Sequence, residues 1–269
     1  MRNGSIDYLR FLGALGIIWF HMHLPHAVIG LAALHMFIIF LVYFGVGKSI
    51  SDRASRLLIP WAIWSLIFGA VEVADALASG GSFSDEFKPW MLLTGPAMHL
   101  WFLPFAFGFL VLFQWMSGQI LWVVAVVVVA VSIWATNNID LQIPIAQWSS
   151  VLPSAMLGLL MAKTRSYLVI GLVFAGGAYG LYLVGWDRST LQIAIGAASV
   201  VLVMTIQTPS NVVSRFLSEV SLGMYLVHPL LLAVVARLTI SDQYLRFAFV
   251  AGAALIITVI LKRFVPRAV

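Results

Sequence analysis

Apolar runs of about 20 residues, the length needed to cross the hydrocarbon core of a membrane, recur along the whole chain. Only short polar connections separate them, a pattern that predicts membrane-spanning helices. Ten spans are expected, over residues 8–24, 27–47, 57–78, 98–117, 119–136, 149–163, 167–185, 190–207, 217–238 and 244–263. The pattern therefore predicts an all-α, polytopic integral membrane protein.

The connections leave no room for a separate soluble domain, so residues 1–269 are expected to form a single transmembrane domain. The stretch after residue 7 has no small-residue cleavage site, which argues against a cleavable signal peptide. The longest connection, residues 75–97, contains Gly80, Asp85 and Glu86 and is predicted to be a polar loop. An interfacial segment is expected around Trp90.

Composition supports a membrane setting. Hydrophobic residues make up 62% of the chain, charged residues 9%, and the mean hydropathy is +1.03. Soluble domains carry roughly 25% charged residues. The absence of cysteine excludes disulfides, thiolate metal ligands and cysteine nucleophiles. The net charge of +5 is scattered between apolar runs. The expected partner is therefore membrane lipid and not nucleic acid.

Lysine and arginine are distributed unequally between the two sides of the predicted bundle. One side receives Arg2, Lys48, Arg53, Arg56, Lys163, Arg165, Arg215, Lys262, Arg263 and Arg267. The other side receives Lys88 and Arg188, with Arg237 and Arg246 near its edge, and the acids Asp75, Asp85, Glu86, Asp140, Asp187 and Asp242. Basic residues mark the cytoplasmic side of a bacterial-type inner membrane, so both termini are predicted to be cytoplasmic.

The first span contains Arg10 and His21, and ionisable residues inside a span usually mark function. Their separation of eleven residues is about three helical turns, so both project from one face, about 16 Å apart along the axis. The alternative is that Arg10 reaches the lipid headgroups while His21 hydrogen-bonds to a neighbouring helix. Spacing alone does not favour one interpretation over the other.

The ninth span carries Ser221, Tyr225 and His228 on one face, at i, i+4 and i+7. His228 is expected at a depth similar to that of His21. Polar stripes of this kind commonly form a hydrogen-bonded seam between membrane helices. From the spacing alone, a seam is favoured over a catalytic role.

Other polar residues lie near the predicted ends of spans. His99 begins the fourth span, where histidine is ordinarily an interfacial anchor, and Glu72 is read as an interfacial carboxylate. His23, His26 and His35 are interpreted as loop or packing residues. No metal site is predicted. The chain has no Walker-type glycine loop, paired-carboxylate metal signature or glycine-framed serine, so its chemistry must use histidine, arginine and hydroxyl groups.

Four segments, taken together, resemble the acyltransferase-3 family of integral membrane acyltransferases. They are residues 6–10 (IDYLR) with His21, residues 56–61 (RLLIPW), residues 99–103 (HLWFL) and residues 221–229 (SLGMYLVHP). Their order and spacing cover most of the chain. The ten-helix layout of that family agrees with the count of spans.

The resemblance implies transfer of an acyl group, usually acetyl, from cytoplasmic acyl-CoA to a hydroxyl of an exopolysaccharide, a lipid-linked glycan or another envelope sugar. It implies that His21 is the residue nearest the chemistry, with Arg10 as its required partner. Because the pKa of an imidazole lies close to working pH, we expect His21 to act as general base on the acceptor hydroxyl or to take up the acyl group transiently. Arg10 and Arg56 are the expected contacts of the donor phosphates, because guanidinium pairs well with phosphate oxygens. His228 and Tyr225 are candidates for orienting His21 or stabilising the oxyanion. Further candidates are Ser221, His99, Trp101 and Glu72.

Two other classes of function fit a ten-span protein with polar stripes. One is a transporter or flippase for a lipid-linked sugar or a small anion. The two halves of the chain show no convincing repeat, although many transporters have one. The other is a non-catalytic subunit of a polysaccharide export complex, which would not require Arg10 and His21 to share a face. The sequence pattern specifies neither the acceptor sugar nor the oligomeric state.

Overall fold

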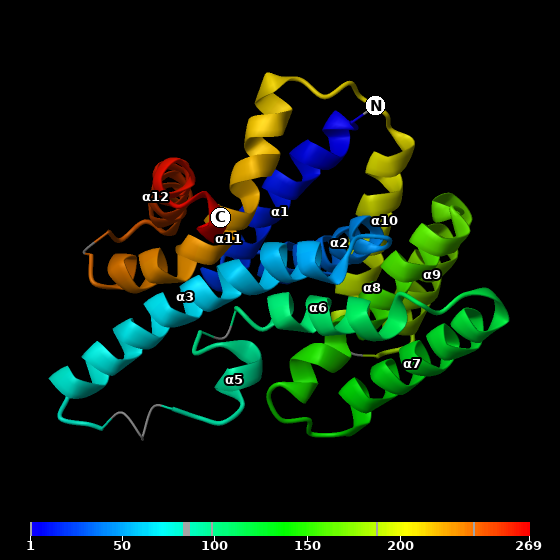
Figure 1. The fold of residues 1–269 in the computed structure, drawn as a ribbon, viewed down its shortest axis with the longest axis horizontal. Helices are drawn as coiled ribbons and strands as arrows, with labels where there is room; N and C mark the ends of the chain where they lie inside the picture. The colour runs from blue at the N-terminus through cyan, green and yellow to red at the C-terminus, as the bar shows by residue number, and fades with distance from the viewer. Residues whose placement is uncertain (1, 83–86, 98, 187, 239) are drawn as a thin grey trace.

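The computed structural model describes residues 2–82, 87–97, 99–186, 188–238 and 240–269 (Figure 1). These residues form helices and connections, with no β-strand among them and one isolated bridge between Asn3 and Pro209. The prediction of an all-α protein is confirmed. Three acids assigned to the outer side, Asp85, Glu86 and Asp187, lie outside the described residues.

Every predicted span contains a helix. The ten helices of twelve or more residues in the described part of the chain are α1 (Gly4–His21), α2 (Ala27–Gly45), α3 (Ile50–Ala78), α6 (Phe102–Phe113), α7 (Gly118–Asn138), α8 (Ile145–Thr164), α9 (Tyr167–Leu183), α10 (Arg188–Thr205), α11 (Val212–Ala236) and α12 (Gln243–Phe264). Two short helices accompany them, α5 (Met91–Thr94) directly after Trp90 and η1 (Pro266–Ala268).

Among the described helices, seven are long and apolar enough to cross a membrane: α2, α3, α7, α8, α10, α11 and α12. The helices α6 and α9 are shorter, and α1 carries the charged Asp7 and Arg10. The membrane-protein class is therefore supported, while a count of ten spans stays a prediction.

The helix α3 begins seven residues before the predicted third span. The hydroxyl of Ser49 accepts a hydrogen bond from the backbone N–H of Asp52 at 3.0 Å, a standard N-terminal cap. The prediction followed only the apolar run and placed Pro60 near the opening of the helix. Pro60 lies inside α3, and the added turns carry Arg53 and Arg56 along the helix.

Three helices approach α2 closely at glycines. A Cβ atom on Gly30 of α2 would lie 2.3 Å from the carbonyl oxygen of Gly16 on α1. On α8, a Cβ on Gly158 would lie 2.6 Å from the Ile39 oxygen, and on α10 one on Gly196 would lie 2.9 Å from the Ala32 oxygen. Small residues allow such approaches between membrane helices, so α2 is the central helix against which α1, α8 and α10 pack.

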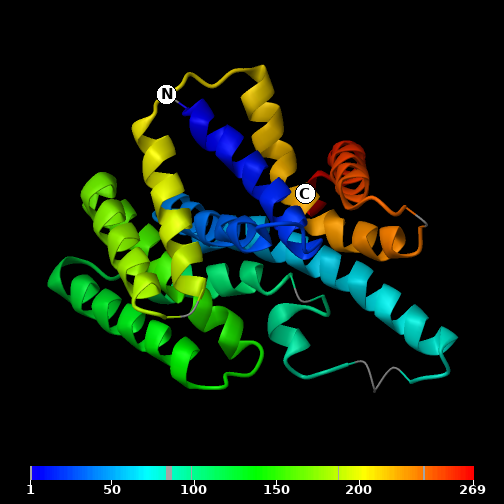
Figure 2. The same cartoon turned by 180° about the vertical axis from the view of Figure 1, so that it is seen from behind.

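The helices α1 and α11 run side by side in the same direction, as Figures 1 and 2 show from opposite sides. The start of α1 is held against the last turn of α10 and the connection that follows it. The backbone N–H of Gly4 donates to the Thr208 oxygen at 2.8 Å, and the Asn3 amide donates to the Val203 oxygen at 2.8 Å. This attachment sets the axial register of α1 against α11.

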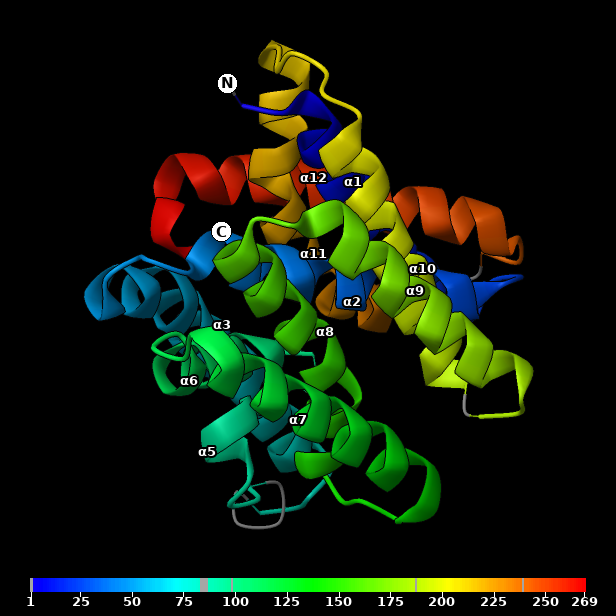
Figure 3. The same cartoon turned by 90° about the vertical axis from the view of Figure 1, so that its right-hand side faces the viewer.

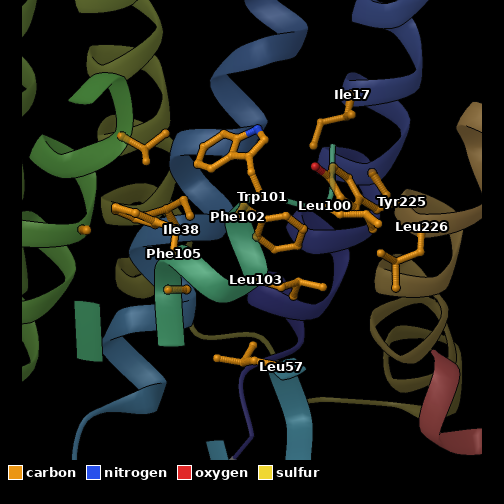
Figure 4. Close-up of a cluster of buried hydrophobic side chains, with 14 of the residues drawn as sticks. Ile17, Ile38, Leu57, Leu100, Trp101, Phe102, Leu103, Phe105, Tyr225 and Leu226 are labelled. Carbon is orange, nitrogen blue, oxygen red and sulfur yellow. The ribbon is translucent and has the colours of Figure 1, made fainter. Parts of the chain in front are cut away.

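The remaining helices surround this centre. Figure 3 shows α7 beside α8 in the lower part of the view and α12 crossing the upper part behind α1 and α11. The largest apolar cluster brings together Ile17 of α1, Leu103 of α6 and Tyr225 of α11 (Figure 4). Burial of this cluster joins α1, α6 and α11 into one unit.

Candidate functional site

Two pairs of polar residues connect α1 to α11. Nη1 of Arg10 donates to the hydroxyl of Ser218 at 2.9 Å, and the rings of His21 and His228 have centroids 5.2 Å apart. Because the helices run in the same direction, the separations of eleven residues on α1 and ten on α11 match, at about 15–16 Å along the axes. Arg10 and His21 therefore both meet α11.

A network around the carboxylate of Asp7 stabilises the Arg10 end of α1. Asp7, one turn before Arg10, has only 4% of its surface exposed. It forms an ion pair with Arg2, at 2.8 Å between Nε and Oδ2, and accepts a hydrogen bond from Ser210 at 3.1 Å. The hydrogen bond to Asp7 raises the pKa of the Arg2 guanidinium above its ordinary value. These contacts hold α1 in place around Arg10.

At the other end of this interface, three histidines from three segments come together with Tyr225. The ring centroid of His99 lies 5.8 Å from that of His228 and 5.7 Å from that of Tyr225. The Tyr225 hydroxyl donates to the backbone oxygen of His99 at 2.8 Å. His99 is only 7% exposed, so its interpretation as an interfacial anchor is wrong. The reason is that the segment before α6 folds inward against α11.

Pro229 explains how His228 is oriented. Proline has no backbone N–H, so the carbonyl of Tyr225, four residues earlier, receives no hydrogen bond from the helix ladder. That carbonyl accepts a hydrogen bond from Nδ1 of His228 at 2.5 Å. Since a carbonyl oxygen only accepts, Nδ1 must carry the proton, and in the neutral ring Nε2 keeps a lone pair. Figure 1 shows α11 bending at this level.

The histidines differ in accessibility. His228 is fully buried, and the Nε2 atoms of His228 and His99 have no hydrogen-bond partner among the described residues. His21 is the last residue of α1 and its side chain is exposed. One imidazole is therefore open to a substrate, while two buried imidazoles lie behind it.

A cavity of about 810 Å³ opens on the Arg10 side of the site. Five cationic residues line it: Arg10, Lys48, Arg53, Arg56 and Arg267. Asp52 is the only acid among the lining residues. Lys48, Arg56 and Arg267 are exposed and mark a cationic opening of the cavity. The apolar lining residues include the buried Phe40, Leu103 and Leu110, together with Phe37, Leu41 and Phe44. The cavity therefore combines a cationic opening with apolar lining, which suits a long molecule that is anionic at one end.

Arg53 is the most enclosed of these cations, with 3% of its surface exposed. Its Nε donates to the Gly45 oxygen at 3.0 Å, and its Nη2 contacts the Lys48 oxygen and the side-chain oxygen of Gln114. Nη1 is buried and has no hydrogen-bond partner within the described residues. Arg53 thus ties the start of α3 to the ends of α2 and α6, and its positive charge is not paired with a described carboxylate.

Tyr225 belongs both to the cavity lining and to the histidine cluster. Its side chain, like that of Ser221, belongs to the cavity lining, whereas His21, His99 and His228 do not. The same ring touches His228, with centroids 5.7 Å apart. The hydroxyl of Ser221 donates to the Ser218 oxygen at 2.8 Å, within α11. The polar stripe of Ser221, Tyr225 and His228 therefore contains residues that form hydrogen bonds and residues that line the cavity.

None of the other candidate residues in the described part of the chain makes a ring contact with His21, His99 or His228. The Trp101 ring is buried against Phe105, and Glu72 is exposed on α3. His23 and His26 lie in the connection between α1 and α2. His35 is buried in α2, where Nδ1 is 2.9 Å from the hydroxyl of Ser154 on α8. No described group of three or more histidines and acids is arranged to hold a metal ion.

Sequence reasoning missed four residues of this site: Ser218, Lys48, Arg53 and Arg267. The three cations had been interpreted only as determinants of orientation. Arg53 precedes Arg56 by three residues, a spacing that places both near one helix face and could have identified it. The positions of Ser218 and Arg267 depend on contacts between distant segments, so no local pattern marks them.

The family model described as an acyltransferase domain, Acyl_transf_3, matches residues 3–263, nearly the whole chain. The chain belongs to the acyltransferase-3 family. Searches of curated proteins and of solved structures gave no match. This acyltransferase-3 protein is therefore a membrane acyltransferase. Its family membership favours an enzyme over a transporter or a non-catalytic subunit.

Proposed function

We propose that this acyltransferase moves an acyl group, with acetyl the favoured case, from cytoplasmic acyl-CoA to a hydroxyl of an envelope or exopolysaccharide sugar. The observation that carries the proposal is the cavity with five cationic lining residues, whose lining also includes Tyr225. Through Tyr225 the cavity adjoins the histidine cluster. One site thus combines a polyanion-binding opening with a candidate base.

The dimensions of the cavity suit an acyl-CoA donor. Its volume of about 810 Å³ lies in the range of small-molecule pockets, about 300–1,000 Å³. The donor phosphates are assigned to Arg10, Arg53 and Arg56, because guanidinium groups bind phosphate strongly. The apolar walls would then contact the pantetheine arm, which must span about 16 Å from the level of Arg10 to that of His21.

His21 is assigned as the general base. In this step the imidazole removes the proton of the acceptor hydroxyl, and the resulting oxygen attacks the thioester carbonyl. The carbon–sulfur bond then breaks, and the imidazolium returns its proton to the departing CoA thiolate. A relay in which His21 itself takes up the acyl group would give the same products in two transfers.

His228 and Tyr225 are assigned as positioning residues. Nε2 of His228 has a lone pair that can accept a hydrogen bond from the His21 ring, which would orient the reactive nitrogen of His21 toward the acceptor. The Tyr225 hydroxyl is already bonded to the His99 backbone. Its simplest role is to keep the histidine cluster together, and stabilising an oxyanion would require that bond to break.

The exposed side of His21 is assigned to the acceptor, on the side of the site away from the cationic opening. The excess of lysine and arginine at that opening supports a cytoplasmic donor, cytoplasmic termini and an inner-membrane location. A sugar carried on a lipid or an exopolysaccharide chain would then approach His21 from the opposite side.

The test is acetyl-CoA turnover by the detergent-purified protein, with crude envelope glycan as acceptor and thiol release as the measurement. The expected result is acceptor-dependent thiol release that disappears in folded His21→Ala and that, at acetyl-CoA concentrations below the KM, falls about ten- to a hundredfold in folded Arg10→Ala. Donor-dependent thermal stabilisation without turnover would show that the acceptor was wrong. If several acyl-CoA donors produce no stabilisation and no turnover, the proposal is overturned.

A further inference from the structure

The segment after α12 folds back into the protein, and none of the sequence motifs includes it. Residues 265–269 contain the helix η1 and lie between α11 and α3, near the label C in Figures 1 and 3. The indole N–H of Trp64 on α3 donates to the backbone oxygen of Ala268 at 2.8 Å. Both residues are 2% exposed, so this is a buried contact.

A glycine on α11 leaves room for both α12 and the docked segment of residues 265–269. A Cβ atom on Gly223 of α11 would lie 2.9 Å from Cγ1 of Val269 and 2.3 Å from Cγ2 of Thr258 on α12. Any larger residue at position 223 would therefore displace one of these neighbours. The glycine lets both α12 and the segment reach α11.

The docked segment forms part of the cationic cavity. Pro266, Arg267 and Val269 line it together with Arg10 and Arg56. The backbone beside Arg267 is held by the hydrogen bond from Trp64, whereas its side chain is exposed. The two ion pairs found among the described residues do not involve Arg267. A fixed backbone and an unpaired guanidinium at a cationic cavity suit phosphate binding.

We propose that residues 265–269 form one wall of the donor site and that Arg267 binds a phosphate group of the acyl-CoA. This inference rests on the proposed function, because it assigns a phosphate-bearing donor to the cavity. Arg267 is a donor-binding residue and does not touch the reacting atoms. Trp64 is a positioning residue that keeps the segment docked.

The first experiment compares Arg267→Ala with Arg263→Ala, using two donors. Arg263 is an exposed arginine at the end of α12 that does not line the cavity. Acetyl-CoA carries phosphates and S-acetylpantetheine carries none. In Arg267→Ala, kcat/KM for acetyl-CoA should fall about tenfold, the scale of one charged hydrogen bond, while kcat/KM for S-acetylpantetheine should not change. Arg263→Ala should match the wild type with both donors.

The second experiment restores the charge chemically. The natural chain has no cysteine, so an Arg267→Cys variant has a single thiol. Alkylation with 2-bromoethylamine adds a cationic side chain through a thioether, whereas iodoacetamide adds a neutral one of similar length. The cationic adduct should recover most of the acetyl-CoA activity, and the neutral adduct should not.

The role of Trp64 is tested by Trp64→Phe, alone and combined with Arg267→Ala. The single change should lower kcat/KM for acetyl-CoA severalfold, because the segment loses its hydrogen bond. The double variant should be no worse than Arg267→Ala alone, since both changes remove one interaction with the donor. Fully additive losses would overturn the coupling between docking and phosphate binding.

The outcomes separate this inference from the proposed function. A wild-type protein that uses acetyl-CoA while Arg267→Ala behaves like Arg263→Ala would overturn the role of Arg267. Equal losses with acetyl-CoA and S-acetylpantetheine would also overturn it, because that pattern indicates a structural defect. A wild-type protein that uses no acyl-CoA would overturn the proposed function, and the inference with it.

Discussion

The two ends of the α1–α11 interface contain polar groups of opposite character. At the Arg10 end, the residues are mostly cations with aliphatic stems, several of them exposed, and they line a cavity. At the His21 end, the residues are rings packed edge to face, and His99 and His228 are buried. The Arg10 end suits a charged ligand in contact with water, and the His21 end combines two buried imidazoles with one exposed imidazole that can meet an acceptor.

The Arg10 end and the His21 end of the interface also differ in the contacts that hold their side chains in position. Arg53 is held by two backbone oxygens and Gln114, so its position depends on where α2 and α6 end. His228 is held by the carbonyl that Pro229 frees one turn back on its own helix. The comparison teaches that donor binding and chemistry should respond separately to substitution, as the following predictions state.

The largest effect is expected from His21→Ala. Loss of the general base should lower kcat about a hundred- to ten-thousandfold while donor binding stays near that of the wild type. Thiol release measures the rate, and donor-dependent thermal stabilisation measures binding. His23→Ala is the matched control, because His23 lies two residues further along in the connection after α1. Full activity in folded His21→Ala would contradict the assignment.

Arg10→Ala should weaken donor binding at the Arg10 end of the interface. Removal of a charged phosphate contact should raise the KM for acetyl-CoA about ten- to a hundredfold. Lys163→Ala serves as control, because Lys163 belongs to the same predicted cytoplasmic side but does not line the cavity. A fall in kcat with no change in donor affinity would instead place Arg10 in the chemical step, and the two ends would no longer be separable.

Pro229→Ala should have an intermediate effect on catalysis. The restored backbone N–H at position 229 would compete with Nδ1 of His228 for the Tyr225 carbonyl, so His228 would lose its fixed orientation. We expect kcat to fall about tenfold, less than the hundred- to ten-thousandfold expected for loss of the base itself, with little change in donor KM. Pro153→Ala, which removes a proline from the interior of α8, is the control. Equal effects of both changes would indicate general helix distortion.

The smallest effect is a change in stability. Arg53→Lys keeps the charge but loses the fork that reaches Gly45, Lys48 and Gln114. Buried acceptors without donors should lower the free energy of unfolding by about 1–3 kcal/mol, seen as a lower melting temperature in detergent. Arg56→Lys should leave the melting temperature unchanged, because Arg56 is exposed. The same shift in both variants would show that Arg53 is not specifically held.

Much of the site was predictable because it lies on single helices. Three helical turns separate Arg10 from His21, so the helix period alone places them on one face. The same reasoning identified Ser221, Tyr225 and His228 on α11. Their mutual approach was not predictable, because it depends on the register between α1 and α11. The contacts of Asn3 with the end of α10 and of Gly4 with the loop before α11 set that register.

By itself, the sequence determined the fold class, the positions of ten helices and the spacing of polar residues along each helix. Apolar length and the helix period are local properties, and they act before any two helices meet. Only the tertiary structure decided that His99 is buried beside His228, that Arg53 faces a cavity and that the segment around Arg267 docks on Trp64. Each of these depends on close packing between segments distant in the chain, where a few ångströms decide which side chains touch.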